Sequence, residues 1–274
     1  MNYIKVNHEK CTQCGLCVNV CRGVLGMGIN GPEVVKELCI NCGHCVAVCP
    51  KEALDHVNIP LINQIPLGEM PVLDADTAAR FIRSRRSIRS YKETPVPREE
   101  IVKLLDIARF APTACNSQGV VYHVIDKPDT LRSITAATID WAEGEMKKSS
   151  PLSNSPWAHN TAAQIENYRQ TGKDVVLRDA PCVVIAMADK SLMPLGRDNT
   201  HFSFSYAQIY APAIGLATCW GGLFEYCATA GYQPILRLLN LPENVTITGA
   251  LMVGYPQYQY KRLVDRDPLK VTWQ

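Results

Sequence analysis

Eight of the chain's twelve cysteines lie within residues 11–49, and their spacing is repeated. In each half, three cysteines follow one another at intervals of three residues, and a fourth comes four residues later. The two sets are Cys11, Cys14, Cys17 and Cys21, then Cys39, Cys42, Cys45 and Cys49, the last followed by Pro50. Thiolates three residues apart in a tight turn can converge on three corners of one cubic metal–sulfide cluster, whereas the fourth points away. The spacing therefore predicts metal or redox chemistry.

This spacing resembles that of bacterial ferredoxins, in which the fourth cysteine of each half ligates the cluster of the other half. The resemblance implies two [4Fe-4S] clusters. Cluster I is assigned to Cys11, Cys14, Cys17 and Cys49, and cluster II to Cys39, Cys42, Cys45 and Cys21. Structural zinc on paired C-x-x-C units is the alternative, but zinc does not explain a third and a fourth cysteine at the same offsets in both halves. We expect Gly15 and Gly43 to let backbone N–H groups turn toward the sulfurs.

Two residues of this segment depart from the simplest pattern. Cys21 is followed by Arg22 where ferredoxins usually carry proline, so we expect an altered loop over residues 22–28, beside cluster II. His44 lies inside the second motif, but four thiolates complete the ligand set, so we expect a solvent-facing residue. Because so small a domain buries little apolar surface, cluster binding should supply much of its folding free energy.

Composition limits the other classes of function. The chain has 274 residues, of which 47% are hydrophobic, and a net charge of +2, which is too small to indicate a nucleic-acid or anionic-membrane partner. The first residues lack a secretory pattern, and no apolar run reaches the length of a membrane span. We therefore expect a cytoplasmic protein. Because cysteines are kept reduced in the cytoplasm, metal or redox chemistry is favoured over disulfides.

The change in composition after the cysteines predicts a division of the chain. We assign residues 1–58 to the ferredoxin-like domain, 59–76 to a linker and 77–274 to a larger domain. Residues 56–76 contain Pro60, Pro66 and Pro71 without helical periodicity, which predicts an extended connector. From Asp76 onward the pattern favours a helix.

Periodicity predicts a mixed α/β (α+β) domain in which helices flank a central mixed sheet. The expected strands are Val120–Ile125, Cys182–Ala188 and Val245–Val253, and the second is an unbroken apolar run typical of a strand covered on both faces. One helix is expected to begin at Pro97 and to end before Pro112. Further helices are expected over residues 130–148, 158–171, 200–216 and 233–239.

Four short motifs occur in order along this domain. A basic run alone is typical of a solvated helix end, so its meaning depends on the motifs that follow it. The motifs are Arg85-Arg86-Ser87-Ile88-Arg89, Ala111-Pro112-Thr113-Ala114-Cys115-Asn116-Ser117-Gln118, Gly215-Leu216-Ala217-Thr218-Cys219-Trp220-Gly221-Gly222, and Gly254-Tyr255-Pro256 with Lys261-Arg262. Together they resemble the FMN-dependent nitroreductase family from about residue 78 to the C-terminus.

The resemblance implies a homodimer with two FMN sites at the subunit interface, each built from both chains. It places Arg85 and Ser87 on the FMN phosphate, where a guanidinium and a hydroxyl match the anion. Arg89 would reach the N1/O2 edge of the flavin ring and stabilise the anionic reduced form. The full set of implied cofactor residues is Arg85, Arg86, Ser87, Arg89, Pro112, Thr113, Ala114, Asn116, Gly221, Gly222, Lys261 and Arg262.

Three of these assignments carry their own reasoning. Asn116 would hydrogen-bond the ring edge, although asparagine also suits a plain turn. Gly221 and Gly222 would bring backbone N–H groups toward flavin N5. The family usually offers a K-x-R pair to the phosphate, but here Lys261 and Arg262 are adjacent, and Arg262 is the favoured contact.

Two cysteines and three residues of the variable stretch could also have functional roles, but each has a plainer structural interpretation. Cys115 and Cys219 could suggest a thiol mechanism, but no base is identifiable beside either, and a buried free cysteine usually behaves as a small hydrophobe. Trp157, His159 and Tyr168 lie in the variable stretch where the family builds its substrate lid, or they are core and surface residues.

The predicted function is that of an iron–sulfur flavoprotein oxidoreductase. A low-potential donor, ferredoxin or flavodoxin, would pass single electrons through the clusters to FMN, which reduces a small acceptor such as a nitroaromatic, a quinone or an activated alkene. The alternatives are a reductive dehalogenation, a flavin-modifying reaction, or a non-catalytic electron carrier or redox sensor.

Overall fold

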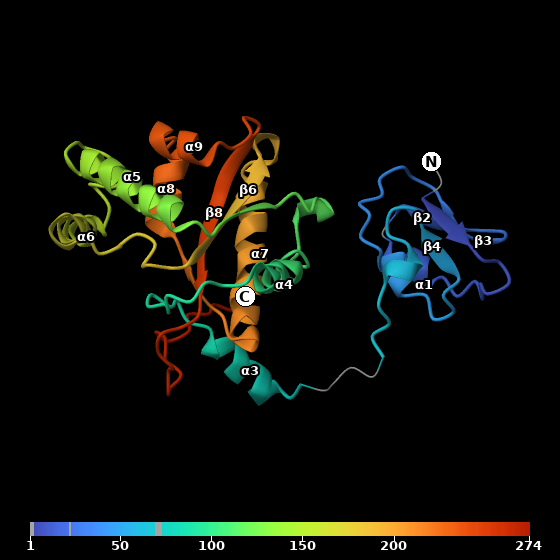
Figure 1. Ribbon diagram of the computed structural model, residues 1–274. Helices are drawn as coiled ribbons and strands as arrows, with labels where there is room; N and C mark the ends of the chain where they lie inside the picture. The colour runs from blue at the N-terminus through green and yellow to red at the C-terminus, as the bar shows by residue number, and fades with distance from the viewer. Residues whose placement is uncertain (1–2, 22, 69–72) are drawn as a thin grey trace. The chain divides into compact units, whose positions relative to one another are not determined.

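The computed structural model describes residues 3–21, 23–68 and 73–274 (Figure 1). The chain divides into two compact units, the first made of residues 1–72 with 115–117 and the second of residues 73–114 with 118–274. Arg22 and Pro71 lie outside the described residues. The predicted domain limits at residues 58 and 76 stay predictions.

In its described residues, the first unit consists of two short antiparallel ribbons and two short helices. Strand β1 (Ile4–Val6) pairs with β4 (Leu54–His56), and β2 (Leu25–Gly28) pairs with β3 (Gly31–Val34). Residues 25–28 of the expected altered loop therefore form a strand. The helices are α1 (Leu16–Val20) and α2 (His44–Ala47), and a 3₁₀ turn covers Leu61–Asn63.

The core of this unit is small and includes two cysteines. It is formed by the buried side chains Ile4, Cys17, Leu25, Cys45, Val46 and Leu54. Few apolar groups are available to stabilise the unit, so the expected dependence of its stability on bound clusters has a structural basis.

The second unit is built on a four-stranded sheet in the order β5-β6-β8-β7. The strands are β5 (Val121–Ile125), β6 (Cys182–Asp189), β8 (Val245–Gly254) and β7 (Ala217–Trp220). All three ladders are antiparallel. An isolated parallel bridge joins Ser87 to Thr218 at the β7 edge. The three predicted strands are confirmed to within one residue, whereas β7 was not predicted.

Helices cover both faces of this sheet (Figure 1). On β6, Val184 and Ala186 face one cluster of buried residues, and Val183 and Ile185 face the other. This confirms the prediction of a strand covered on both sides. The first cluster includes residues of α4 (Arg98–Ala108) and α7 (Leu195–Tyr210), and the second includes residues of α5 (Pro128–Met146), α6 (Ala158–Thr171), α8 (Gly222–Thr229) and α9 (Gln233–Leu239).

Several helix limits differ from those predicted. Helix α7 was expected over residues 200–216, but a 3₁₀ turn at Ala211–Ile214 that contains Pro212 ends it early. Helix α3 (Ala75–Ser84) begins before Asp76 because the Asp74 carboxylate accepts the Thr77 N–H (2.9 Å) and caps it. Helix α4 begins one residue after Pro97.

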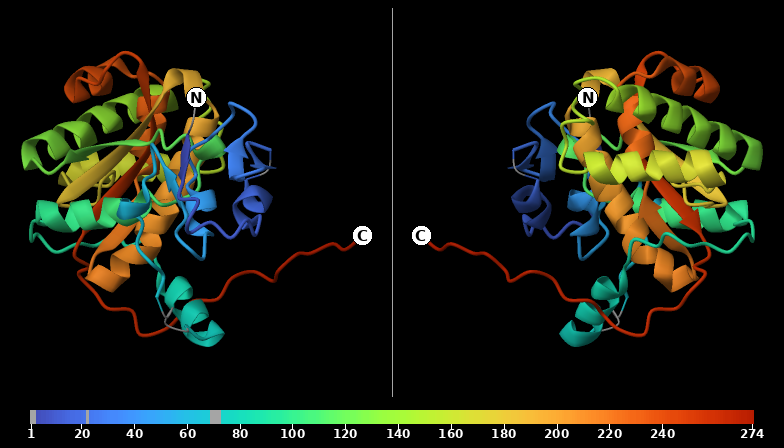
Figure 2. Two further views of the ribbon diagram at one scale, coloured as in Figure 1. Left: turned by 90° about the vertical axis from the view of Figure 1, so that its right-hand side faces the viewer. Right: turned by 90° about the vertical axis from the view of Figure 1, so that its left-hand side faces the viewer.

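No helix in the described part of the chain is long and apolar enough to cross a membrane. The last residues of the second unit, 257–274, are exposed and form neither helix nor strand (Figure 2).

Candidate functional site

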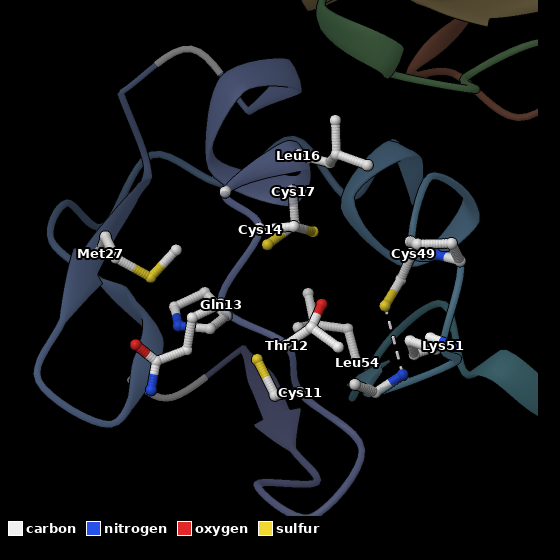
Figure 3. Close-up of a pocket in the computed structure, with 14 residues that line it drawn as sticks. Cys11, Thr12, Gln13, Cys14, Leu16, Cys17, Met27, Cys49, Lys51 and Leu54 are labelled. Carbon is white, nitrogen blue, oxygen red and sulfur yellow. Dashed lines mark hydrogen bonds between the residues drawn. The ribbon is translucent and has the colours of Figure 1, made fainter.

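The four cysteines assigned to cluster I line one pocket in the first unit (Figure 3). Cys11, Cys14 and Cys17 come from the loop and helix at the start of the chain, and Cys49 comes from the second half of the repeat. The Ala53 N–H donates to the Cys49 Sγ (3.3 Å). The structure therefore brings together the three close cysteines of one half and the last cysteine of the other half.

The sequence repeat is also a repeat of backbone conformation. Gln13 and Asn41 have φ values of 53° and 54°, and Gly15 and Gly43 have 76° and 73°. These left-handed residues turn the chain between the cysteines and place Gly15 and Gly43 directly before α1 and α2. At Gly43 an added Cβ would lie 2.9 Å from the Ile59 Cγ2, so both the conformation and the available space favour glycine.

Electrostatics group the cysteines in the same two sets. Burial raises the pKa of Cys17, and the nearby Cys49 and Cys11 raise it further. Burial raises the pKa of Cys45 to about 11, and Cys21 is the largest of the neighbouring thiol contributions. Cys17 and Cys45 thus each lie within electrostatic reach of cysteines assigned to the same cluster.

These sites fit an iron–sulfur cluster. Their donors are four soft sulfurs, and buried thiolates so close together need a compensating positive charge, which iron supplies. Within residues 3–21, 23–68 and 73–274, no three His, Cys, Asp or Glu side chains are placed to hold a single metal ion. His44 is exposed, as expected.

A basic pocket of 170 Å³ lies in the second unit. Its lining residues contain four guanidinium groups, one hydroxyl and no carboxylate: Arg85, Arg86, Ser87, Arg89, Val264 and Arg266. The Arg86 Nη1 is buried and has no hydrogen-bond partner within the described part of the chain. A buried donor without an acceptor is costly, and an anion in the pocket would supply one. The residues therefore fit a phosphate group.

Backbone pairing holds this segment against the sheet. The Ile88 N–H donates to the Thr218 carbonyl (3.0 Å), next to the Ser87–Thr218 bridge. The Lys92 N–H donates to the Tyr255 carbonyl (2.9 Å). In extended backbone, alternate residues point to the same side, which suits Arg85, Ser87 and Arg89 to one anion. Arg86, between them, also lines the pocket, and its guanidinium lies over the Tyr260 ring.

The C-terminal contribution to the pocket differs from the sequence-based expectation. Arg266 is among the lining residues, and neither Lys261 nor Arg262 is. Sequence reasoning missed Arg266 because it lies between two aspartates in a polar tail. The available signal was a further arginine four residues beyond Arg262.

The Pro112–Asn116 segment is held by side chains of the second unit at its start. The Ala114 N–H donates to the Asn199 Oδ1 (2.9 Å), and the Gln118 N–H donates to the Thr113 Oγ1 (3.0 Å). Asn116 has a φ of 53°, which asparagine adopts more readily than most residues, and it belongs to the short segment grouped with the first unit. Its flavin role stays a prediction beside the turn interpretation.

The two glycines after β7 have different backbone roles. The Gly221 N–H donates to the Ala250 carbonyl (2.8 Å), and a Cβ there would lie 3.3 Å from the Ala250 Cβ. Gly222 begins α8, and the first N–H groups of a helix have no acceptor within it. Gly222 is therefore better placed than Gly221 to offer an N–H to a cofactor.

A buried carboxylate that the sequence did not indicate supports this turn. Glu225 is 5% exposed and accepts hydrogen bonds from the Trp220 Nε1 (2.5 Å) and the Arg197 Nη2 (3.2 Å). The His201 ring meets the Trp220 ring edge-on at 5.1 Å. Glu225 thus ties the end of β7 to helices α7 and α8 on both sides of Gly221.

The remaining predicted residues are placed as follows. Cys219 is buried, and burial raises its pKa, in keeping with a small hydrophobic residue. Cys115 is exposed, so the interpretation of it as buried is wrong. Trp157 and His159 are exposed at the start of α6, whereas Tyr168 is half-buried and packs against the core.

Residues 82–255 match the model of the nitroreductase family. The chain belongs to the nitroreductase family. Residues 3–50 also match a 4Fe-4S dicluster domain, so this family member is an oxidoreductase with an N-terminal iron–sulfur domain.

Relatives of this family member are similar over most of their length. A putative NADH dehydrogenase/NAD(P)H nitroreductase of Methanothermobacter thermautotrophicus is 24% identical, over 73% of this chain and 85% of its own. An NADH dehydrogenase of Thermus thermophilus is 27% identical, over 68% of this chain and 89% of its own. An iodotyrosine deiodinase of Nematostella vectensis is 24% identical, over 75% of this chain and 77% of its own.

Solved structures share the fold. A nitroreductase with bound FMN from Bacteroides fragilis has a TM-score of 0.56 at 16% identity, covering 71% of this chain and 98% of its own. An oxidised iodotyrosine deiodinase bound to FMN and 3-iodo-L-tyrosine has a TM-score of 0.55 at 18% identity, covering 72% of this chain and 98% of its own. The nitroreductase-like fold of the second unit is confirmed.

The role of Glu225 leads to a stability prediction. Glu225→Ala leaves the partly buried Trp220 N–H without its acceptor and removes the carboxylate that pairs with the half-exposed Arg197, so we expect the free energy of unfolding of the second unit to fall by about 2 kcal/mol. All four tryptophans lie in this unit. Tryptophan fluorescence during urea unfolding therefore measures the effect.

Asp106→Ala is the control, because Asp106 pairs with Arg109 on an exposed helix face (2.6 Å) and should matter far less. Equal losses in the two variants would show that Glu225 has no special structural role.

Proposed function

We propose that this protein is an iron–sulfur flavoprotein in which two [4Fe-4S] clusters pass electrons to FMN, and FMN reduces an organic acceptor. The observation that carries the proposal is the presence, in one chain, of two four-cysteine sets and of a basic pocket at the edge of a nitroreductase-like sheet. When bound, the clusters supply single electrons, and FMN converts them into two-electron chemistry.

The basic pocket is the proposed site of the FMN phosphate. Arg85, Ser87 and Arg266 line it, and the unpartnered Arg86 Nη1 adds a donor beside it. Guanidinium groups bind phosphate oxygens with charge-assisted hydrogen bonds. In addition, the second unit carries no G-x-G-x-x-G sequence for a dinucleotide, so FMN is favoured over FAD.

The flavin ring is proposed to extend from this pocket past Arg89 toward the turn at Gly222. Arg89 would place positive charge near N1 and O2 of the ring and thereby stabilise its anionic reduced form. The Gly222 N–H would approach N5, and Glu225 would keep that turn in place. Pro112, Thr113, Ala114 and Asn116 would complete the cofactor site.

A homodimer is proposed on the basis of an apolar groove in the second unit. The groove lies between helices α3, α4 and α7 and has a volume of 390 Å³. Its lining is apolar and aromatic: Phe81, Ile82, Ile107, Tyr206, Ile209 and Tyr210. A second copy of this chain is the proposed occupant, because the family resemblance builds each FMN site from two subunits.

The acceptor is proposed to be a small organic molecule such as a nitroaromatic, a quinone or an activated alkene. Reductive dehalogenation is the second candidate, and the similarity to iodotyrosine deiodinases favours it specifically. The remaining alternatives are a flavin-modifying reaction and a non-catalytic electron carrier or redox sensor, and turnover with any acceptor would exclude the non-catalytic roles. We further propose a cytoplasmic location, with ferredoxin or flavodoxin as donor.

The C-terminal arginine is predicted to bind the phosphate. Arg266→Ala should weaken FMN binding by about ten- to a hundredfold, because each charge-assisted hydrogen bond contributes about 1.5–3 kcal/mol. Arg262→Ala should change the affinity little, because Arg262 does not line the pocket. Flavin fluorescence titration of the apoprotein measures both affinities. A larger loss at Arg262 would restore the assignment made from the sequence.

Electron delivery through the clusters is the central prediction. A Cys11→Ala, Cys39→Ala double variant should lose FMN reduction by reduced ferredoxin while retaining FMN that dithionite still reduces. Anaerobic stopped-flow absorbance measures the rate. The parent protein should contain about eight iron and eight sulfide per chain, and four or fewer would contradict two clusters.

The control for that experiment is Cys227→Ala, which removes a buried cysteine of the second unit and leaves both cysteine sets intact. It should behave as the parent protein does. Rapid FMN reduction by NADPH in the parent protein, together with normal turnover of the double variant, would disprove the cluster route.

Assembly is predicted to be dimeric. Sedimentation equilibrium of the FMN-loaded protein should give about twice the chain mass of 30.4 kDa. An Ile209→Asp variant, which places a charge in the apolar groove, should shift the population toward the monomer. A parent protein that remains monomeric at micromolar concentration would contradict the shared FMN site.

A further inference from the structure

His56 is a buried histidine of the first unit that the cysteine motifs do not include. It ends β4, and only 2% of its surface is exposed. Its Nε2 lies 3.4 Å from the Sγ of Cys39, a ligand assigned to cluster II. Tyr3 stacks beside the ring, with centroids 6.4 Å apart and planes inclined by 7°.

The surrounding backbone determines which ring nitrogen carries the proton. The Asn58 N–H and the Ile59 N–H both point at the His56 Nδ1, at 3.1 Å and 3.2 Å. A nitrogen that accepts hydrogen bonds carries no proton, so the proton of the neutral ring is on Nε2. The Nε2–H is therefore the donor to the Cys39 sulfur.

The turn that presents this ring is itself held in place. The Asp55 Oδ1 accepts the His56 N–H (2.8 Å) and the Leu61 N–H (2.7 Å). The same turn thus fixes the histidine backbone and supplies the two amides that orient its ring. The direction of the Nε2–H is therefore set by backbone amides and by the Asp55 carboxylate.

The two halves of the repeat differ at this position. His56 comes seven residues after Cys49, and the residue seven after Cys21 is Gly28. Backbone amides donate to sulfurs in both sets, from Ala53 to Cys49 (3.3 Å) and from Asn41 to Cys39 (3.4 Å). Glycine offers no side-chain donor, so the histidine donor is a feature of the second half.

We propose that His56 is a positioning residue that donates its Nε2–H to the Cys39 thiolate and thereby raises the reduction potential of cluster II. A hydrogen bond to a ligating sulfur withdraws negative charge and so stabilises the reduced, more negative cluster over the oxidised one. The inference rests on the proposed function, because it requires a cluster bound to Cys39. It distinguishes two clusters whose ligand sets are otherwise alike.

Two conservative variants separate the roles of the two ring nitrogens. In His56→Asn, the side-chain oxygen can still accept the Asn58 and Ile59 amides, but no donor reaches the sulfur. In His56→Gln, the longer side chain returns an N–H near the Nε2 position. His44→Asn is the matched control, because His44 lies inside the second cysteine motif but is exposed.

The measurement is an EPR-monitored redox titration of the full chain, purified anaerobically. For His56→Asn we expect the potential of one cluster to fall by about 59 mV, which corresponds to a tenfold change for a one-electron couple, while the other cluster is unchanged. His56→Gln should recover most of the shift, and His44→Asn should match the parent. An unchanged potential in His56→Asn with full iron content overturns the proposal.

A measurement on the parent protein covers the case in which the variants do not assemble clusters. With ¹⁵N-labelled histidine, pulsed EPR of the reduced protein should detect a histidine nitrogen and an exchangeable proton coupled to one cluster. The absence of both couplings overturns the proposal. Iron and sulfide analysis keeps the two hypotheses apart, since four iron or fewer contradicts the two-cluster function, and a histidine coupling to a remaining cluster would still support the His56 contact.

Discussion

The hydrogen bond from Ile88 to Thr218 is the interaction on which the basic pocket depends. It attaches the segment around Ser87 to β7, the edge strand of the sheet. In such an extended conformation, alternate residues present their side chains to the same side. As a helix end, the same basic run would spread its arginines around an axis. The phosphate site is therefore a property of backbone pairing as much as of composition.

A second constraint applies to the first unit, where the stability of the fold depends on how the charge of its buried thiolates is compensated. Cys17 and Cys45 are members of its small core and also ligands assigned to different clusters. Burial favours their neutral thiols, whereas metal binding requires thiolates. Cluster insertion must therefore proceed together with the folding of this core, and each half of the repeat contributes one buried ligand to it.

Sequence reasoning succeeded where the signal was local and failed where it depended on the path of the chain. The cysteine sets and strand β6 were predictable because spacing and an unbroken apolar run are visible in sequence. Strand β7 and helix α8 were missed, because a glycine-rich stretch masks the change from one element to the other. Arg266 was missed because its place in the pocket depends on the course of the chain after β8.

The histidines illustrate the same limit. His44 attracted attention because it lies within a motif, yet it is exposed. His56 lies beyond the last cysteine and reaches Cys39 only because β4 pairs with β1 and the chain then turns back. Glu225 is similar, since nothing in the sequence shows that its carboxylate meets both Trp220 and Arg197.

The paired segment also has a consequence for solubility. Strand β7 lies at one edge of its sheet, and an edge strand with free backbone groups can recruit a strand from another molecule and so begin aggregation. The segment from Ser87 to Lys92 occupies part of that edge. Its far end pairs with Tyr255 and Pro256, the residues that follow β8. Ser87, one of the residues proposed to hold the phosphate, therefore belongs to a segment that also shields the sheet from intermolecular strand addition, and detaching that segment would expose the edge of β7 as well as disrupt the anion site.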